Sequence, residues 1–181
     1  MSKLTEERIS GEEVFRGSFL RLYRDQVRLP DGSQTVREYL RHPGAVLIAP
    51  LLADGRVVLE RQFRYPHGRE FIELPAGKRE EGEAPLVTAQ RELLEETGYA
   101  AGQWTRLGII HNAIGYSNEG IEMYVAQDLE KREARLDAGE FLEVLTVPLA
   151  EAVAMVRDGR ITDAKTVSAL LWVDKWVSIR R

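Results

Sequence analysis

The sequence predicts an α+β fold in which a mixed β-sheet lies between helices and a small antiparallel sheet precedes it. Three observations support this prediction: strand-like segments open the chain, two apolar strands follow them, and helical spacing occurs near residue 84 and in the last third. Hydrophobic residues make up 44% and charged residues 30% of the 181 residues, as in ordinary folded domains. A chain of this length suffices for one core, so we expect one globular unit with a small appendage.

The first forty residues have the pattern of antiparallel strands. Residues 19–29 are rich in aromatic and aliphatic side chains, and residues 34–40 resume the pattern. Pro30-Asp31-Gly32-Ser33 separates the two segments and has the composition of a turn. We therefore predict a small antiparallel sheet within residues 12–41.

A break at His42-Pro43-Gly44 separates this sheet from the main body. The apolar run 45–52 that follows has the pattern of a buried strand, and a tight turn leads from it into a second strand at 56–63. We place the domain boundary near residue 42, with an N-terminal sheet at 1–42 and the main domain at 43–181.

Helical spacing begins near residue 84 and continues to residue 97. Pro85 suits the first turn of such a helix, and Gly98 is a suitable residue at its end. The remaining predicted elements are strands near 104–111, 120–127 and 142–147 and helices at 148–156 and 162–179. Strands and helices in this order suggest a sheet with helices packed on it.

Charge and composition exclude several classes of function. The formal net charge is −4 and no long run of Lys or Arg occurs, so we expect no nucleic-acid partner. The absence of cysteine excludes disulfides, thiolate nucleophiles and cysteine-ligated zinc. No apolar run has membrane-spanning length, and the first thirteen residues lack the apolar core of a signal peptide. We therefore expect a cytoplasmic protein with no membrane partner.

Two carboxylates of the predicted helix, Glu92 and Glu96, stand four residues apart and share one face, where like charges repel. Taken alone, such a pair usually belongs to a solvated acidic surface. The helix follows Glu83 and the segment Glu73-Leu74-Pro75-Ala76-Gly77, a rigid turn where backbone atoms can approach a ligand. Because hard divalent cations bind several oxygen ligands, we predict a metal site here.

The same region resembles the signature of the Nudix hydrolases. The matching positions are Gly77, then Glu83 after five residues, Arg91-Glu92-Leu93 after seven, Glu95-Glu96 after one, and Gly98-Tyr99 after one. The resemblance implies the Nudix fold, an α/β/α sandwich, and hydrolysis of a nucleoside diphosphate derivative with Mg2+ as cofactor and Mn2+ as a substitute. In such hydrolysis, metals neutralise phosphate oxygens and lower the pKa of the attacking water.

Carried over position by position, the resemblance implies roles for individual residues of the signature. Glu92 and Glu96 would bind the metal together with the carbonyl of Ala76. Arg91 and Glu95, one helical turn apart, would form a pair that braces the helix and orients the catalytic site.

The family also uses a glutamate in a mobile loop after the signature, as general base or as an extra metal ligand. Glu140 and Glu143 are the candidates in this chain. We favour Glu140 because Glu143 begins a predicted strand. Glu83 is expected to anchor the loop before the helix, since groups behind the ligands fix their geometry.

Outside the signature, the chain resembles the ADP-ribose pyrophosphatase and nucleoside diphosphate sugar hydrolase branch over nearly its whole length. The shared segments are Val14-Phe15-Arg16-Gly17, Leu29-Pro30-Asp31-Gly32, His42-Pro43-Gly44-Ala45-Val46, Arg61-Gln62-Phe63-Arg64, Glu73-Leu74-Pro75-Ala76-Gly77 and Gly115-Tyr116-Ser117-Asn118-Glu119. In this branch the N-terminal sheet packs or exchanges across a two-fold dimer and helps to hold the nucleotide. The resemblance implies a homodimer in which residues 1–42 serve dimerisation and substrate binding.

Substrate binding is predicted for Arg64, Arg69 and Glu119. Arg64 matches a family arginine near the substrate, where a guanidinium suits phosphate recognition, although a surface arginine at a strand end is the alternative. The favoured reaction splits ADP-ribose into AMP and ribose 5-phosphate. Two departures leave GDP-mannose or another nucleotide sugar open: Ala113-Ile114-Gly115 stands where ADP-ribose hydrolases commonly carry Ser-Pro-Gly, and Ala138 stands at an acidic position.

Two further hypotheses concern other functions of the same fold. A Nudix module that binds a nucleotide without hydrolysing it usually loses signature carboxylates, whereas this chain keeps Glu92, Glu95 and Glu96. A nucleoside triphosphatase is a further alternative, but the N-terminal extension argues against it. We therefore expect an enzyme.

Overall fold

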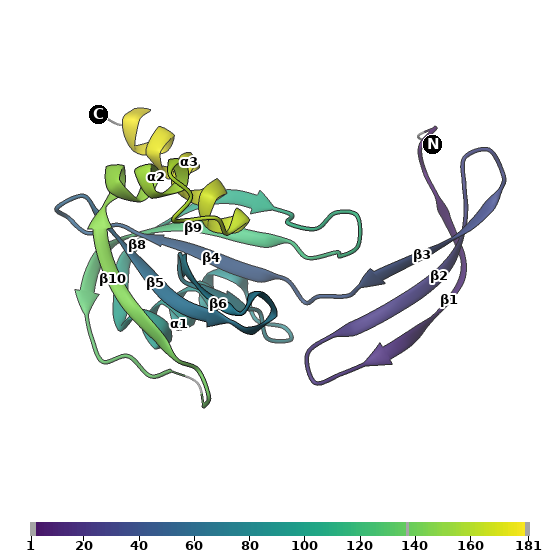
Figure 1. The fold of residues 1–181 in the computed structure, drawn as a ribbon, viewed down its shortest axis with the longest axis horizontal. Helices are drawn as coiled ribbons and strands as arrows, with labels where there is room; N and C mark the ends of the chain where they lie inside the picture. Colours follow the sequence, from purple (N-terminus) through teal and green to yellow (C-terminus); the bar gives the residue numbers. More distant parts are fainter. Residues whose placement is uncertain (1–2, 137, 180–181) are drawn as a thin grey trace. The chain divides into compact units, whose positions relative to one another are not determined.

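The computed structural model of this chain describes residues 3–136 and 138–179, and it describes side chains up to residue 175. Figure 1 shows the arrangement of its helices and strands. In chain order they are β1 (Glu7–Arg16), β2 (Arg21–Arg28), β3 (Gln34–Leu40), β4 (Ala45–Pro50), β5 (Arg56–Arg64), the 3-10 helix η1 (Tyr65–His67), β6 (Arg69–Glu73), β7 (Ala76–Lys78), α1 (Pro85–Thr97), β8 (Tyr99–Ile110), β9 (Ile121–Lys131), β10 (Leu142–Pro148), α2 (Leu149–Arg157) and α3 (Ala164–Ile179). Among the described residues, no helix is long and apolar enough to cross a membrane.

The first unit is an antiparallel three-stranded sheet in the order β1-β2-β3. It comprises the described residues up to Gly44 together with Ala113–Glu119, whose backbone pairs with Leu40 at the end of β3. In the described part of this unit only Asp25 and Val27 are buried, so the sheet has little core of its own. The predicted N-terminal antiparallel sheet is confirmed. Its first strand begins before the predicted range because charged residues in β1 obscure the alternation.

The second unit, Ala45–Asn112 with the described residues from Gly120 onward, contains two sheets. The mixed sheet has the order β7-β4-β9-β8, in which β4 pairs antiparallel with β7 and parallel with β9. The other sheet is antiparallel and has the order β10-β5-β6. The sequence predicts one mixed sheet. In the structure, Leu51 directly after β4 forms an isolated bridge with Val57 of β5, and the two strands belong to separate sheets.

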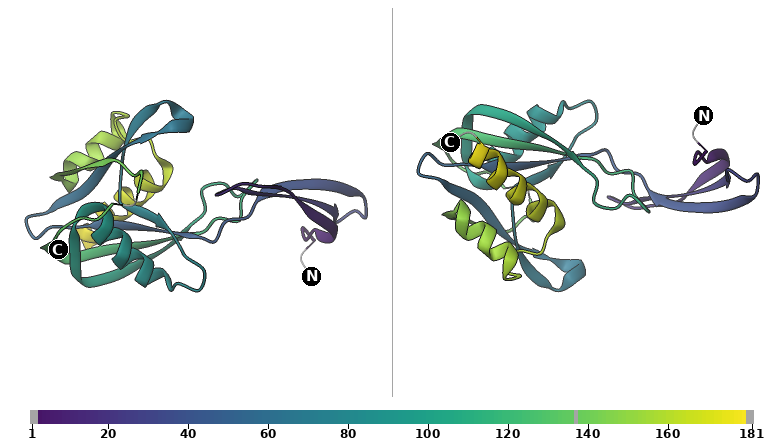
Figure 2. Two further views of the ribbon diagram at one scale, coloured as in Figure 1. Left: turned by 90° about the horizontal axis from the view of Figure 1, so that it is seen from below. Right: turned by 90° about the horizontal axis from the view of Figure 1, so that it is seen from above.

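Helices cover this unit on two sides, with β4 between them (Figure 2). Because side chains alternate along a strand, Val46 and Ile48 of β4 pack toward α1, whereas Leu47 and Ala49 pack toward α2 and α3. The α1 side of the core includes Ala89 and Leu93, and the opposite side includes Ala152, Leu170 and Val173. The predicted α/β/α sandwich is thereby confirmed, and β4 is apolar throughout because both of its faces are buried.

Helix α1 is the element that positions the predicted site. It begins at Pro85 and ends before Gly98, which has a left-handed φ of 66° and donates its N–H to the Leu94 carbonyl at 2.9 Å. The predicted helix is therefore confirmed within one residue. Strands β6 and β7 were not predicted, because strands of 5 and 3 residues are too short to show alternation.

Candidate active site

Glu96 connects helix α1 to the loop of residues 74–77, whose last two residues, Ala76 and Gly77, are the first two of β7. Its side chain is buried, and its Oε2 accepts a hydrogen bond from the backbone N–H of Ala76 at 3.1 Å. The loop is fixed from its other side, because the carbonyl of Pro75 accepts the N–H of Ile48 in β4 at 2.9 Å. The structure therefore brings Ala76 and Glu96 together, through the amide of Ala76. The predicted role of the Ala76 carbonyl as a metal ligand stays a prediction.

Glu92 packs against Gly77, one turn before Glu96 on the same helix. A Cβ atom on Gly77 would lie 1.9 Å from Cδ and 2.0 Å from Oε1 of Glu92. Glycine therefore leaves room for the Glu92 carboxylate, which would have to move aside for any larger residue. The backbone conformation does not require glycine, because φ of Gly77 is not positive. Glu92 is partly buried, and its Oε1 lies 2.9 Å from Nη1 of Arg91.

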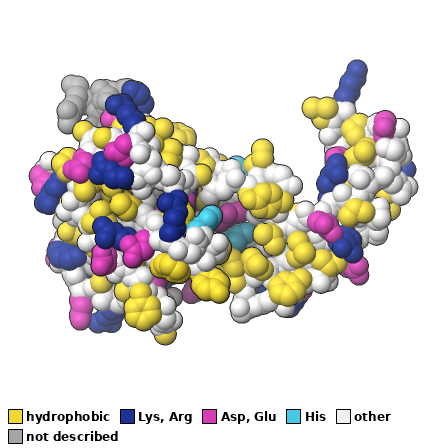
Figure 3. All heavy atoms as spheres, viewed as in Figure 1, with side chains coloured by type: hydrophobic (Ala, Val, Ile, Leu, Met, Phe, Trp, Pro, Cys, Tyr) yellow, Lys and Arg dark blue, Asp and Glu magenta, His cyan; other side chains and the backbone are white. Residues whose placement is uncertain are grey.

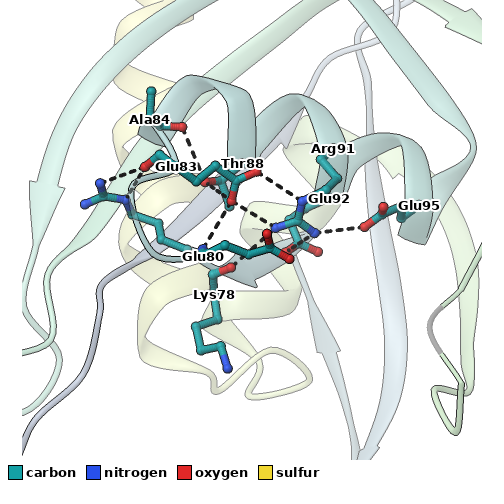
Figure 4. Close-up of polar contacts among 9 residues, drawn as sticks. Lys78, Glu80, Glu83, Ala84, Thr88, Arg91, Glu92 and Glu95 are labelled. Atoms are coloured by element: carbon teal, nitrogen blue, oxygen red, sulfur yellow. Dashed lines mark hydrogen bonds and ion pairs between the residues drawn. The ribbon is translucent and has the colours of Figure 1, made fainter.

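Arg91 is the centre of an ion-pair network along α1 (Figure 4). Its Nη1 donates to Glu95 Oε2 at 2.9 Å, which is the predicted pairing, and its Nε and Nη2 donate to the two oxygens of Glu83 at 3.2 Å each. Glu83 also accepts the N–H of Glu80 at 3.2 Å and the hydroxyl of Thr88 at 2.8 Å. These contacts, with the hydrogen bond from Arg91 contributing most, lower the pKa of Glu83 to about 2. Glu83 therefore anchors the loop before the helix.

The two carboxylates predicted to bind metal have perturbed ionisation. Burial raises the pKa of Glu92, and the nearby charges of Glu95 and Glu140 add to this effect, whereas Arg91 opposes it. Burial also raises the pKa of Glu96 well above its ordinary value, with further contributions from neighbouring carboxylates. Burial and neighbouring negative charge thus disfavour the ionised form of both carboxylates, and a bound cation would stabilise that form.

The structure distinguishes the two candidate loop glutamates. Glu140 lies just before β10, where its Oε1 accepts a hydrogen bond from Nε2 of Gln62 at 3.2 Å, and its charge acts on both Glu92 and Glu96. Glu143 lies within β10, with a side chain that is 76% exposed and pairs with Arg61 at 3.4 Å. Glu140 is therefore the one that lies near the helix carboxylates.

Glu60 in β5 is a further acidic residue of this region that was not predicted from the sequence. It is 1% exposed, and its Oε2 has no hydrogen-bond partner among the described residues. Burial, followed by the charge of Glu73, raises its pKa, and Glu60 in turn raises the pKa of Glu96. The signal in the sequence was a carboxylate directly after the buried run 57–59, where a strand would otherwise carry an apolar side chain.

Arg64 and Arg69 lie at opposite ends of the β5-β6 connection. Arg64 binds Glu73 through two hydrogen bonds, from Nε at 2.7 Å and from Nη2 at 2.8 Å, and its side chain is 39% exposed. Arg69 donates to Thr162 Oγ1 at 3.0 Å and lies 4.2 Å from the centre of the Phe71 ring. Their predicted substrate contacts stay predictions, and for Arg64 they would involve the donors that Glu73 does not use.

Glu119 belongs to the N-terminal unit. Its Oε1 lies 3.5 Å from Nδ1 of His42, and the same nitrogen accepts the N–H of Gly44 at 3.1 Å. The contact is an ion pair only when the His42 ring is protonated. The predicted role of Glu119 in substrate binding stays a prediction.

The donor atoms near α1 suit a hard divalent cation. Glu60, Glu92, Glu96 and Glu140 supply carboxylate oxygens, which Mg2+ and similar ions prefer, and a cation would relieve their mutual repulsion. Oε2 of buried Glu60 has no hydrogen-bond partner among the described residues, so a cation could bind it. Within the described residues, no three acidic, histidine or cysteine side chains stand close enough to form a completed metal site.

Comparison with known proteins extends these observations to the whole chain. The sequence profile of the NUDIX domain matches residues 40–170, and that of the nucleoside diphosphate sugar hydrolase N-terminal domain matches residues 6–40. A solved structure described as an ADP compounds hydrolase has a TM-score of 0.89 and 27% sequence identity, and the match covers 99% of this chain and 98% of that chain.

Three curated relatives differ in their named activities. The chain is 40% identical to an ADP-ribose pyrophosphatase of Bacillus subtilis, over 96% of this chain and 95% of that protein. It is 42% identical to a methanol dehydrogenase activator of Bacillus methanolicus, with the same coverage. It is 36% identical to a GDP-mannose pyrophosphatase of Pectobacterium atrosepticum, over 75% of each protein. Together with the geometry around α1, these matches show that the chain belongs to the Nudix family of hydrolases, which generally need divalent metal ions.

Proposed function

We propose that this Nudix hydrolase cleaves the pyrophosphate bond of ADP-ribose and releases AMP and ribose 5-phosphate, with Mg2+ as its cofactor. The observation that carries the proposal is the pair of carboxylates on α1, partly buried Glu92 and buried Glu96, which face the loop at Ala76 and Gly77. Similarity over nearly the full length to an ADP-ribose pyrophosphatase supports the choice of substrate.

Glu92, Glu96 and the Ala76 carbonyl would hold the cation. Bound there, Mg2+, or Mn2+ in its place, would neutralise phosphate oxygens and lower the pKa of the attacking water. Glu92 would exchange its contact with Arg91 for the cation, and Arg91 would keep its hydrogen bonds to Glu83 and Glu95. The network around Arg91 thus holds α1 in place when the metal site forms.

Glu140 would act as the general base that accepts a proton from the attacking water. It lies in the segment before β10, and among the described residues its side chain accepts a hydrogen bond from Gln62. Such a lightly held carboxylate can approach a bound substrate, as a general base must. Arg64, Arg69 and Glu119 would bind the phosphates and the sugar, with the guanidinium groups matched to phosphate oxygens.

We include a homodimer in the proposal, with the N-terminal sheet at residues 1–42 as its interface and part of its substrate site. The sheet buries little of its own surface, and Figure 3 shows apolar side chains at its surface. The exposed apolar residues of this unit include Ile9, Val14, Phe15, Phe19, Leu20 and Val36. A second copy that covers them would supply the core that the sheet lacks. Light scattering on protein eluting from a size-exclusion column tests for the homodimer, and a monomer at micromolar concentration would rule the homodimer out.

Hydrolysis of GDP-mannose or another nucleotide sugar is the second candidate. The segment Ala113-Ile114-Gly115, in place of Ser-Pro-Gly, favours it, as does the similarity to a GDP-mannose pyrophosphatase. Both candidates use the same metal site and the same attack on phosphorus, so they differ only in base and sugar recognition.

The test is phosphate release, after treatment with a phosphatase, from ADP-ribose, GDP-mannose, other nucleotide sugars, dinucleoside polyphosphates and nucleoside triphosphates, each with Mg2+ and with a chelator. We expect chelator-sensitive cleavage with the highest kcat/KM for ADP-ribose. Higher kcat/KM for GDP-mannose would select the second candidate. No cleavage by folded protein with Mg2+ present would support a nucleotide-binding module instead.

A further inference from the structure

The first turn of α3 has a fixed geometry that begins with Asp163. The Asp163 carboxylate accepts the N–H of Thr166 at 3.0 Å and the Lys165 ammonium at 2.9 Å, and its carbonyl accepts the N–H of Val167 at 2.9 Å. This is the arrangement of an N-cap residue, which satisfies amides that a helix leaves unpaired at its start. The side chains of Lys165 and Thr166 therefore project from a rigid turn.

These two consecutive residues bind two consecutive residues at the end of β6. The Lys165 ammonium donates to Oε2 of Glu73, and Oγ1 of Thr166 accepts the N–H of Leu74 at 2.9 Å. Glu73, Leu74 and Thr166 are buried. The partners are 92 residues apart in each pair, so the contacts join distant parts of the chain.

The segment held in this way leads directly into the loop of the proposed metal site. Two residues after Leu74, Ala76 donates its N–H to Glu96, and Gly77 then packs against the carboxylate of Glu92. The loop therefore lies between an attachment to α3 on one side and the two carboxylates of α1 on the other. A displacement of Leu74 would move the backbone that meets both carboxylates.

We propose that Lys165 and Thr166 are positioning residues for the metal site, which set the place of the loop at Ala76 and Gly77 relative to Glu92 and Glu96. This inference rests on the proposed role of Glu92 and Glu96 in metal binding. Groups behind the ligands of a metal site typically change metal affinity or activity by about 10- to 100-fold when they are removed.

Two features make these residues suitable for a test. Glu73 accepts two hydrogen bonds from Arg64, so it keeps a cationic partner when Lys165 is replaced. Replacing Thr166 with Val keeps the shape of the side chain and removes the acceptor for Leu74, whereas Ser keeps that acceptor. Thr166→Val thus removes the contact with Leu74, and Lys165→Met removes the contacts of Lys165 with Glu73 and Asp163. Lys165→Arg and Thr166→Ser are the matched controls.

The experiment measures Mn2+ binding without substrate by titration calorimetry, kcat and KM with Mg2+, and the melting temperature for each variant. Val173→Ala, which removes buried volume from the same helix away from these contacts, controls for general loss of stability. We expect Thr166→Val and Lys165→Met to weaken Mn2+ binding and lower kcat by about tenfold or more, with a smaller change in KM. Thr166→Ser and Val173→Ala should keep Mn2+ affinity and kcat near those of the unchanged protein.

The proposal would be overturned if Thr166→Val and Lys165→Met lower the melting temperature but leave Mn2+ affinity and kcat unchanged. If Thr166→Val does not fold, the comparison of Lys165→Met with Lys165→Arg tests the proposal by the same measurements. Mn2+ binding separates this inference from the choice of substrate, because it is measured without any nucleotide. An unchanged protein that binds no Mn2+ would refute the metal site and this inference together.

Discussion

Gly77→Ala tests the contact between the loop and helix α1 most directly. The added Cβ would lie 1.9 Å from Cδ of Glu92, and ordinary contact begins at 3.4 Å, so the carboxylate must retreat by about 1.5 Å. The backbone at Gly77 does not need glycine for its φ, so the strain falls on the side chain of Glu92. The substitution therefore displaces a proposed metal ligand while the backbone conformation stays accessible.

The expected loss follows from the size of this displacement. Misplacing a reacting or coordinating group by about 1 Å costs on the order of 100-fold in rate. We expect kcat with Mg2+ to fall by roughly 100-fold, which corresponds to about 3 kcal/mol of activation free energy. The free energy of unfolding should change much less, because the end of a partly buried side chain can move.

Steady-state hydrolysis with Mg2+, Mn2+ titration and urea unfolding together provide the assay. A double-mutant cycle with Glu92→Ala identifies the cause, since that variant removes the atoms that the new Cβ would meet. If Gly77 acts through Glu92, adding Gly77→Ala to Glu92→Ala costs little more. Near-normal kcat in Gly77→Ala, or the same loss in both backgrounds, would refute the reasoning.

The remaining predictions concern single carboxylates. Glu96→Gln keeps an acceptor for the Ala76 amide but removes the charge, so we expect a folded protein whose kcat is lower by orders of magnitude; near-normal turnover would contradict its role as a ligand. Glu140→Gln should lower kcat by about 100-fold or more, whereas Glu143→Gln, on an exposed side chain, should leave kcat unchanged; the reverse order would make Glu143 the base. Glu83 has a folded pKa of about 2, below its ordinary value of 4.5, so its stabilising contribution is full above pH 4.5 and is lost as the pH falls toward 2. Urea unfolding of Glu83→Gln beside the unchanged protein should show a stability difference that disappears over this pH range, and a difference independent of pH would mean that charge is not its source.

The sequence alone was sufficient for the parts of the fold that depend on local pattern. The apolar run of β4, the Pro85 start and Gly98 end of α1, and the turn between β2 and β3 all have a local chemical cause. These features place the signature on a helix that follows a rigid loop. The spacing of the signature residues is fixed along one helix and the turn before it, so the sequence is enough to identify the family.

The short strands and the division into two sheets could not be predicted in the same way. β6 and β7 contain too few residues to show a period, and β7 pairs with β4, which is not its neighbour in the sequence. Likewise, a turn between two apolar strands does not reveal whether they pair along their length. In this chain β4 and β5 separate after the bridge between Leu51 and Val57, because each strand also pairs with a distant segment, β4 with β9 and β5 with β10.

The sequence thus determined the residues of α1 that carry the signature, since their spacing is a property of one helix. Only the tertiary structure showed that buried Glu60 influences Glu96, that Glu140 lies nearer to these carboxylates than Glu143 does, and that Lys165 and Thr166 hold the loop at Leu74. Each of these relations joins residues from different strands and helices. Burial and charge at such sites depend on which segments pack together, and a local pattern contains no information on that packing.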